Sequence, residues 1–250
     1  MKWLRKNKKE KKETKGLKLS VKSYLFPPVH ARGVGFASIA LLISLAFICW
    51  CKEVNLLGLI FLEITLAIYY FFRNPSRVVP QGEDLIVAPA DGIVSNVTTC
   101  VPPKDMCLGE EPLTRVSIFM SVFDVHINRS PMTGKITHMH YIPGKFCNIA
   151  DKDNEDNERN EYTLETEDGV QIGFVQIAGL IARRIVPFVQ EGFALKTGER
   201  FGLICFGSRV DVYLPKGVAS QVLIGQKMVA GETIIARLGV QETQYNGESI

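Results

Sequence analysis

Three residues of the types used in nucleophilic catalysis lie at turns or strand ends of the sequence: Ser208, His126 and Asp91. A serine hydroxyl becomes a nucleophile when a histidine removes its proton, and a carboxylate can hold that histidine in the required orientation. Ser208 directly follows Gly207. The sequence has no Gly-x-Ser-x-Gly elbow, so it gives no support to an α/β-hydrolase.

Each of these residues also has a purely structural interpretation. Asp91 belongs to an Asp-Gly pair, which commonly forms a turn between two strands. A histidine at a strand end, such as His126, is more often structural, although its neighbour Asp124 favours a polar pocket. The pair Gly207-Ser208 between two apolar strands is also typical of a β-bulge or a bend. The order Asp, His, Ser therefore does not identify a chemistry by itself.

Short apolar runs broken by turn signals predict a β-rich domain from residue 85 onward. Strands are expected at 85–87, 93–97, 115–124, 134–142, 162–165, 170–177, 201–205 and 210–214. Alternation in the strand 134–142 puts His138 and His140 on one face. Residues 181–189 are expected to form a helix. The predicted class is α+β, with a β-rich domain that resembles a barrel-sandwich and two N-terminal apolar helices.

Two apolar segments follow a basic N-terminal arm. Residues 1–32 carry eleven Lys or Arg and two Glu, a net charge of +9 (11 − 2), whereas the whole chain has a net charge of +3. Residues 34–51 are uncharged and long enough for a membrane-spanning helix, which needs about 20 apolar residues. Residues 56–72 are shorter and contain Glu63. The arm is therefore expected to contact an anionic membrane surface rather than nucleic acid.

Basic residues on both sides of the apolar pair predict that both ends lie in the cytoplasm. A monotopic hairpin that enters one leaflet fits the same pattern. These features divide the chain into a basic cytoplasmic arm (1–32), a membrane-anchoring helical hairpin (33–72), a linker (73–84), a β-rich domain (85–239) and a polar tail (240–250).

The six cysteines show no CxxC pair and no spacing typical of a zinc site, so no metal site is predicted. Reduced thiols in a protein that faces the cytoplasm account for them. A disulfide between Cys100 and Cys107 remains an alternative in an oxidising compartment.

Six stretches in register make the chain similar to the short bacterial form of the phosphatidylserine decarboxylase family. They are FRNP (72–75), APADG (88–92), SVFDVHINRSP (121–131), NERN (157–160), AGLIARRI (178–185) and GERFGLICFGSR (198–209). Members of this family cleave themselves between a glycine and a serine. The resemblance therefore implies cleavage between Gly207 and Ser208 into a β chain of residues 1–207 and an α chain of residues 208–250, with 85–239 as the catalytic domain.

The resemblance also implies a covalent pyruvoyl group formed from Ser208. It implies decarboxylation of phosphatidylserine to phosphatidylethanolamine through a Schiff base with that group. His126, oriented by Asp91, is expected to activate Ser208 for cleavage and later to protonate the substrate carbon. Expected ligands of the lipid phosphate are Arg129, Arg183 and Arg184.

One departure concerns a second histidine. Longer members of the family carry a histidine where this chain has Arg129, and Leu-Gly-Ser-Thr where it has Phe-Gly-Ser-Arg. Either His126 serves both steps, or His138 or His140 contributes; the first is favoured because the other two share a strand face with no evident partner.

The resemblance and the anchor predict a phospholipid substrate and a location at the bacterial inner (cytoplasmic) membrane, with the catalytic domain on the cytoplasmic side. The α and β chains of one precursor would remain partners, and a homodimer is left open. Alternatives are the same chemistry on another serine phospholipid, such as archaetidylserine, a non-catalytic membrane-tethered barrel-sandwich module, or an amidase or esterase that uses an intact Ser208.

Overall fold

The computed structural model describes residues 26–50, 56–144, 157–179, 184–205 and 207–241. The chain divides into two compact units, Met1–Val78 and Val79–Ile250. Outside the described residues lie the basic arm up to residue 25, most of the polar tail, and residue 183. Each unit is described by itself.

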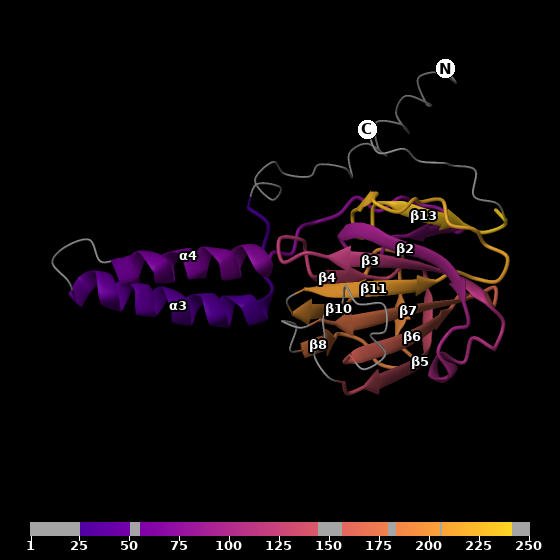
Figure 1. Ribbon diagram of the computed structural model, residues 1–250, viewed down its shortest axis with the longest axis horizontal. Coiled ribbons are helices and arrows are strands. Elements are labelled where there is room, and N and C mark those ends of the chain that lie inside the picture. Colours follow the sequence, from indigo (N-terminus) through magenta and orange to yellow (C-terminus); the bar gives the residue numbers. More distant parts are fainter. Residues whose placement is uncertain (1–25, 51–55, 145–156, 180–183, 206, 242–250) are drawn as a thin grey trace, which may run out of the picture. The chain divides into compact units, whose positions relative to one another are not determined.

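The described part of the first unit contains two helices, α3 (Ala31–Trp50) and α4 (Leu56–Phe71), drawn in indigo and purple in Figure 1. Helix α3 has 20 residues, and its most apolar stretch of 18 residues has a mean hydropathy of 2.2. A helix of this length spans about 30 Å, the thickness of the hydrocarbon core. By length and composition α3 can therefore cross a membrane, while α4 is shorter, at 16 residues.

Small residues let the two helices approach closely. A Cβ at Gly33 would overlap the Phe72 side chain, so only glycine fits at this position. Ser44 is fully buried, and its hydroxyl donates to the Gly58 carbonyl at 2.8 Å. Such contacts are typical of helices that pair within a lipid environment. Most large apolar side chains of both helices point outward and are exposed.

Alternation of apolar and polar residues, together with many β-branched residues, gives the second unit its strands. Their bounds are β1 (Leu85–Val87), β2 (Gly92–Cys100), β3 (Leu113–Met120), β4 (Ile127–Arg129), β5 (Gly134–Ile142), β6 (Arg159–Glu165), β7 (Gln171–Ala178), β8 (Arg184–Pro187), β9 (Ala194–Leu195), β10 (Arg200–Cys205), β11 (Ser208–Tyr213), β12 (Lys227–Met228) and β13 (Ile234–Arg237), with a short 3₁₀ helix, η2 (Lys104–Met106), after β2.

The strands form three antiparallel sheets. The largest is a curled sheet of eight strands in the order β12-β2-β3-β11-β7-β6-β5-β9 (Figure 1). A second sheet has the order β4-β10-β8, and β1 pairs with β13. Although β10 and β11 are consecutive in the chain, they belong to different sheets. The chain therefore passes from one sheet to the other between Cys205 and Ser208.

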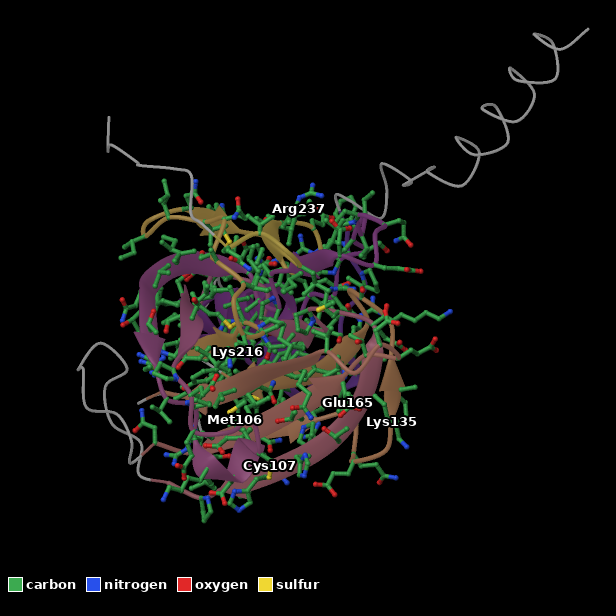
Figure 2. The ribbon with its side chains drawn as sticks, turned by 90° about the vertical axis from the view of Figure 1, so that its right-hand side faces the viewer. Met106, Cys107, Lys135, Glu165, Lys216 and Arg237 are labelled. Atoms are coloured by element: carbon green, nitrogen blue, oxygen red, sulfur yellow. The ribbon has the colours of Figure 1, made fainter. Side chains whose placement is uncertain are left out.

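Side chains on the inner, concave face of the curled sheet form the main core. The core includes Val94, Val116, Ile118, Met120, Ile136, Tyr162, Leu164, Ile172, Phe174, Phe201, Val210 and Val212. A smaller cluster on the outer face consists of Met106, Leu113, Val175, Ile177 and Tyr213. Figure 2 shows Met106 and Cys107 on this side, and Lys135 next to Glu165, its partner across β5 and β6.

The α+β class, the β-rich second unit and the two N-terminal helices are confirmed. The helix expected at 181–189 is wrong over its described part, because Arg184–Pro187 forms strand β8. Ile185 and Val186 are β-branched, and they pair with Ile204 and Leu203 of β10. A distant strand thus determines the local structure.

Candidate active site

Ser208 is the first residue of β11 and is fully buried. It lies between two neighbouring strands, opposite Met120 of β3 and Ala178 of β7. Its hydroxyl donates to the Met120 sulfur at 3.3 Å. A thioether is a weak acceptor, so this contact orients the hydroxyl without strongly stabilising its proton.

Gly207 allows the chain to turn from one sheet into the next. Its φ is +49°, in the left-handed region that favours glycine. A Cβ at Gly207 would meet no atom within 4 Å, so backbone conformation rather than packing requires glycine here. The turn places the Gly207 carbonyl immediately before the buried Ser208 hydroxyl.

His126 immediately precedes β4 and is fully buried. Its Nδ1 lies 3.0 Å from the carbonyl oxygen of Asp124. A carbonyl can only accept, so in this contact Nδ1 carries the proton and Nε2 of the neutral ring carries the lone pair. The backbone therefore selects the tautomer in which Nε2 can act as a base.

Asp91 lies in the turn between β1 and β2 and is half-buried. Its Oδ1 accepts a hydrogen bond from the Ala230 amide at 2.8 Å. In the same turn, the Pro89 carbonyl accepts a hydrogen bond from the Arg129 amide at 2.8 Å. These two bonds tie the Asp91 turn to β4 and to the segment after β12. The role of Asp91 in orienting His126 stays a prediction.

The segments that carry His126 and Ser208 meet at the end of β3. The side-chain Nδ2 of Asn128, two residues after His126, donates to the Met120 sulfur at 3.7 Å. The same sulfur accepts the Ser208 hydroxyl. The carbonyl of His126 also accepts a hydrogen bond from the amide of Ile204 at 3.2 Å, which holds it beside β10.

A chain of buried neutral polar groups extends from this point across the inner face. Asn128 Oδ1 accepts from Gln176 Nε2 at 2.7 Å, and Gln176 Oε1 accepts from the Tyr162 hydroxyl at 2.8 Å. Asn160 Nδ2 donates to the same hydroxyl at 2.6 Å. Burial raises the pKa of Tyr162, which therefore stays a neutral donor. The sequence did not predict these hydrogen bonds; the one signal for them is the presence of polar residues at inward positions of apolar strands.

The comparisons with known proteins decide the family. Residues 64–236 match the family model described as phosphatidylserine decarboxylase. The chain belongs to the phosphatidylserine decarboxylase family. It is therefore an enzyme of the decarboxylase (carboxy-lyase) class.

The curated relatives match along nearly their whole length. The chain is 50% identical over 224 residues to a phosphatidylserine decarboxylase proenzyme of Novosphingobium aromaticivorans, which covers 86% of this chain and 88% of the relative. The proenzyme of the same name from Ruegeria pomeroyi is 50% identical, and the match covers 88% of this chain and 100% of the relative. The one from Cereibacter sphaeroides is 51% identical, and the match covers 90% of this chain and 96% of the relative. The name proenzyme describes relatives that are made as precursors.

The arginines predicted to bind phosphate have different surroundings in the structure. Arg129 of this decarboxylase is buried, and its Nη1 donates to the Gly198 carbonyl at 2.8 Å. Arg184 is exposed at the start of β8, opposite Cys205 of β10. Arg183 lies outside the described residues.

The two histidines of β5, His138 and His140, lie away from Ser208. Strands β6 and β7 separate β5, which carries His138 and His140, from β11. Three strand spacings amount to about 14 Å. The expectation that His140 lacks a partner is wrong, because its Nδ1 lies 3.2 Å from Asp105 Oδ2. These histidines are thus poor candidates for a second group in decarboxylase chemistry.

One group of described residues has the composition of a cation site. Ligand atoms of Asp105, His140 and Glu161 lie within 4.8 Å of one another on the outer face. Glu161 is buried, but its Oε1 already accepts from Arg159 Nε at 2.8 Å. Among the described cysteines, Cys100 and Cys107 are free, so the alternative disulfide between them is not formed.

Proposed function

We propose that this chain decarboxylates phosphatidylserine to phosphatidylethanolamine with a pyruvoyl group made from Ser208. Cleavage of the bond between Gly207 and Ser208 would produce that group and would leave a β chain of 1–207 and an α chain of 208–250. The observation that carries the proposal is a fully buried serine that begins β11 directly after a glycine in the left-handed conformation. Membership in a family whose relatives are named proenzymes supports it.

The cleavage step assigns a role to each residue around this bond. The Ser208 hydroxyl attacks the Gly207 carbonyl carbon, and the absence of a Cβ at Gly207 leaves the approach open. His126 accepts the hydroxyl proton at Nε2, in the tautomer that the Asp124 carbonyl selects. Asp91 stabilises the positive charge that His126 then carries.

The residues around Ser208 fit a pyruvoyl group. Ser208 is enclosed by β3 and β7, and the neutral Asn128–Gln176 pair lies beyond Met120, so no fixed charge among these contacts competes with a reactive carbonyl. A pyruvoyl carbonyl supplies an electrophile for the substrate amine and a sink for the electron pair left by carbon dioxide. His126 supplies the proton that the substrate carbon needs after carbon dioxide leaves.

The substrate phosphate would be held by arginine. Arg184 is exposed at the strand end next to Cys205, three residues before Ser208, and belongs to the proposed site together with Arg183. Arg129 already contacts the Gly198 carbonyl, so we assign it mainly to fixing β4, with phosphate contact as its second role. A guanidinium binds a phosphate through two parallel hydrogen bonds, which also fixes the lipid headgroup in orientation.

The helical hairpin would keep the enzyme beside its substrate. Removing a diacyl lipid from the bilayer costs about 0.8 kcal/mol for each CH₂ group, so the reaction should take place at the membrane surface. The apolar outward faces of α3 and α4 support this anchoring. We place the enzyme at the bacterial inner membrane with the catalytic domain on the cytoplasmic side, in agreement with the basic residues on both flanks of the hairpin.

The test uses the full-length protein in vesicles that contain phosphatidylserine labelled at its carboxyl carbon. The proposal predicts release of labelled carbon dioxide together with phosphatidylethanolamine, and neither product with a Ser208→Ala variant. Vesicles of an ether-linked serine phospholipid test whether the enzyme recognises the headgroup alone. A cleaved, folded protein that releases no carbon dioxide from phosphatidylserine would contradict the proposed function.

A further inference from the structure

The Gly207 carbonyl oxygen has a built-in hydrogen-bond donor. The backbone amide of Gly179 donates to this oxygen, with an N–O distance of 3.1 Å. We infer that the Gly179 amide stabilises the negative charge that develops on the Gly207 oxygen when Ser208 attacks. This inference rests on the proposed self-cleavage and adds to it a catalytic group that is not a side chain.

The β7–β11 pairing holds the donor in place before the reaction begins. Ser208 is opposite Ala178 in this antiparallel pair, so Gly207 and Gly179 extend the same ladder by one residue. The amide of Ala178 donates to the Glu158 carbonyl at 2.9 Å, which fixes the end of β7 from its other side. A donor held by a sheet needs no rearrangement when charge appears, which is the condition for effective oxyanion stabilisation.

Burial increases the effect of this hydrogen bond. Gly207 is half-buried, while Gly179 and Ser208 on either side of the hydrogen bond are buried, which limits the access of water to it from β7. An interaction with a developing charge is stronger at low dielectric than in water. A backbone amide also has no rotamers to restrict, unlike a side-chain donor.

The step is balanced and consumes no other reactant. A bond forms between Ser208 Oγ and the Gly207 carbonyl carbon, the π pair of the carbonyl moves to its oxygen, and the hydroxyl proton passes to His126. The carbon–nitrogen bond then breaks, the pair on oxygen re-forms the carbonyl, and His126 returns the proton to the Ser208 nitrogen. The product is an ester that is an isomer of the peptide. The Gly179 amide acts only on the charged intermediate between these two bond changes.

The experiment removes the N–H group of Gly179 and changes no side chain; the only other change is a weaker acceptor at the Ala178 carbonyl. An amide-to-ester exchange of the Ala178–Gly179 bond, introduced by cell-free synthesis of the full chain, replaces the donor by an oxygen. We expect self-cleavage to slow by about 100-fold, as for the loss of one oxyanion donor in other enzymes. Gly179→Ala keeps the amide and is the matched control, and Gly179→Pro is a second way to remove the donor. Circular dichroism of each uncut protein verifies the fold.

Hydroxylamine separates loss of this donor from a later defect. It cleaves an ester that has formed, so it would rescue a variant that is slow only in elimination. Because hydroxylamine also cleaves the introduced 178–179 ester, rescue is scored only as the fragment that begins at Ser208. We expect no such fragment from the ester-exchanged protein, because its slow step precedes the 207–208 ester. If this protein is folded and cleaves at the wild-type rate, or if hydroxylamine restores its cleavage, the inference is wrong while the proposed function stands. If the wild-type chain does not cleave at 207/208, the proposed function itself fails.

Discussion

The two faces of the curled sheet bury polar groups in different ways. On the inner face, neutral groups satisfy one another from Ser208 and Met120 through Gln176 to Tyr162. On the outer face of the same strands, a carboxylate and a guanidinium are paired: Asp211, only 2% exposed, lies 3.1 Å from Arg209 Nη2.

This difference follows from what each face must do. Apart from the proposed Asp91–His126 pair, the neutral groups of the inner face leave the charge on the Gly207 oxygen without a competing fixed charge, whereas a further buried ion pair on this face would bias it. The outer face can use ion pairs because their contribution is structural. Variants on the inner face should therefore alter chemistry, and variants on the outer face should alter stability.

The largest effect is expected from His126→Ala. Without a base at this position the Ser208 hydroxyl keeps its proton, so we expect self-cleavage to slow by about 1,000-fold or more. The fraction of uncut chain, followed over time on a denaturing gel, measures this rate. Cleavage of the variant at the wild-type rate would remove His126 from the mechanism.

The next largest effect is expected from Asp91→Asn. Asparagine keeps an acceptor for the Ala230 amide but loses the charge that stabilises protonated His126. We expect cleavage to slow by about 100-fold with an unchanged thermal midpoint. Asp91→Ala, which loses both contacts, is the matched comparison. If Asp91→Asn cleaves normally and only Asp91→Ala is slow, the carboxylate serves the turn rather than the chemistry.

On the outer face, Asp211→Asn should lower stability and leave cleavage unchanged. The substitution leaves the Arg209 guanidinium beside a neutral amide in a largely buried position, which costs about 3 kcal/mol of unfolding free energy. Urea unfolding in a Ser208→Ala background, where the chain stays whole, gives the free energy. A cleavage rate reduced as strongly as in His126→Ala would show that the two faces are not separate in function.

The smallest effect is a pH dependence from Tyr213, also on the outer face. Burial and the nearby Asp211 raise the pKa of Tyr213 to about 12. The unfolded chain releases the tyrosine proton near pH 10 while the folded chain keeps it, so this stabilisation is complete below pH 10 and is lost as pH rises to about 12. The loss amounts to roughly 1.4 kcal/mol per pH unit. Tyr213→Phe should show a shallower decline in the same range; equal slopes would contradict the assignment.

The parts of the fold that local patterns determine were predicted from the sequence. Strands β6 and β7 were expected because the apolar runs at 162–165 and 170–177 and the turn residues between them indicate two strands without help from the rest of the chain. Strand β8 was mistaken for a helix because its conformation depends on pairing with β10, which contacts it from a distant part of the sequence. The two N-terminal helices were predicted because long uninterrupted apolar runs indicate helices without help from the rest of the chain.

For the site, the sequence predicted which residues take part but not the contacts between them. Ser208 and His126 could be selected because serine and histidine in those motifs have few chemical roles. The Asn128–Gln176 and His140–Asp105 contacts join residues 48 and 35 positions apart, and no local pattern indicates such pairs. The Gly179 donor leaves no trace in the sequence, since every residue except proline has a backbone amide.

The central claim is that the chain cuts itself at the buried serine, and the mass of the purified protein tests it most directly. Intact-mass measurement of the full 250-residue protein should find two fragments that meet between Gly207 and Ser208, with the smaller of 43 residues (250 − 207) beginning in a pyruvoyl group instead of an amine. Ser208→Ala should give a single chain of 27.9 kDa, less the mass of one oxygen. A single uncut chain in a folded wild-type preparation that releases carbon dioxide from phosphatidylserine would contradict this account.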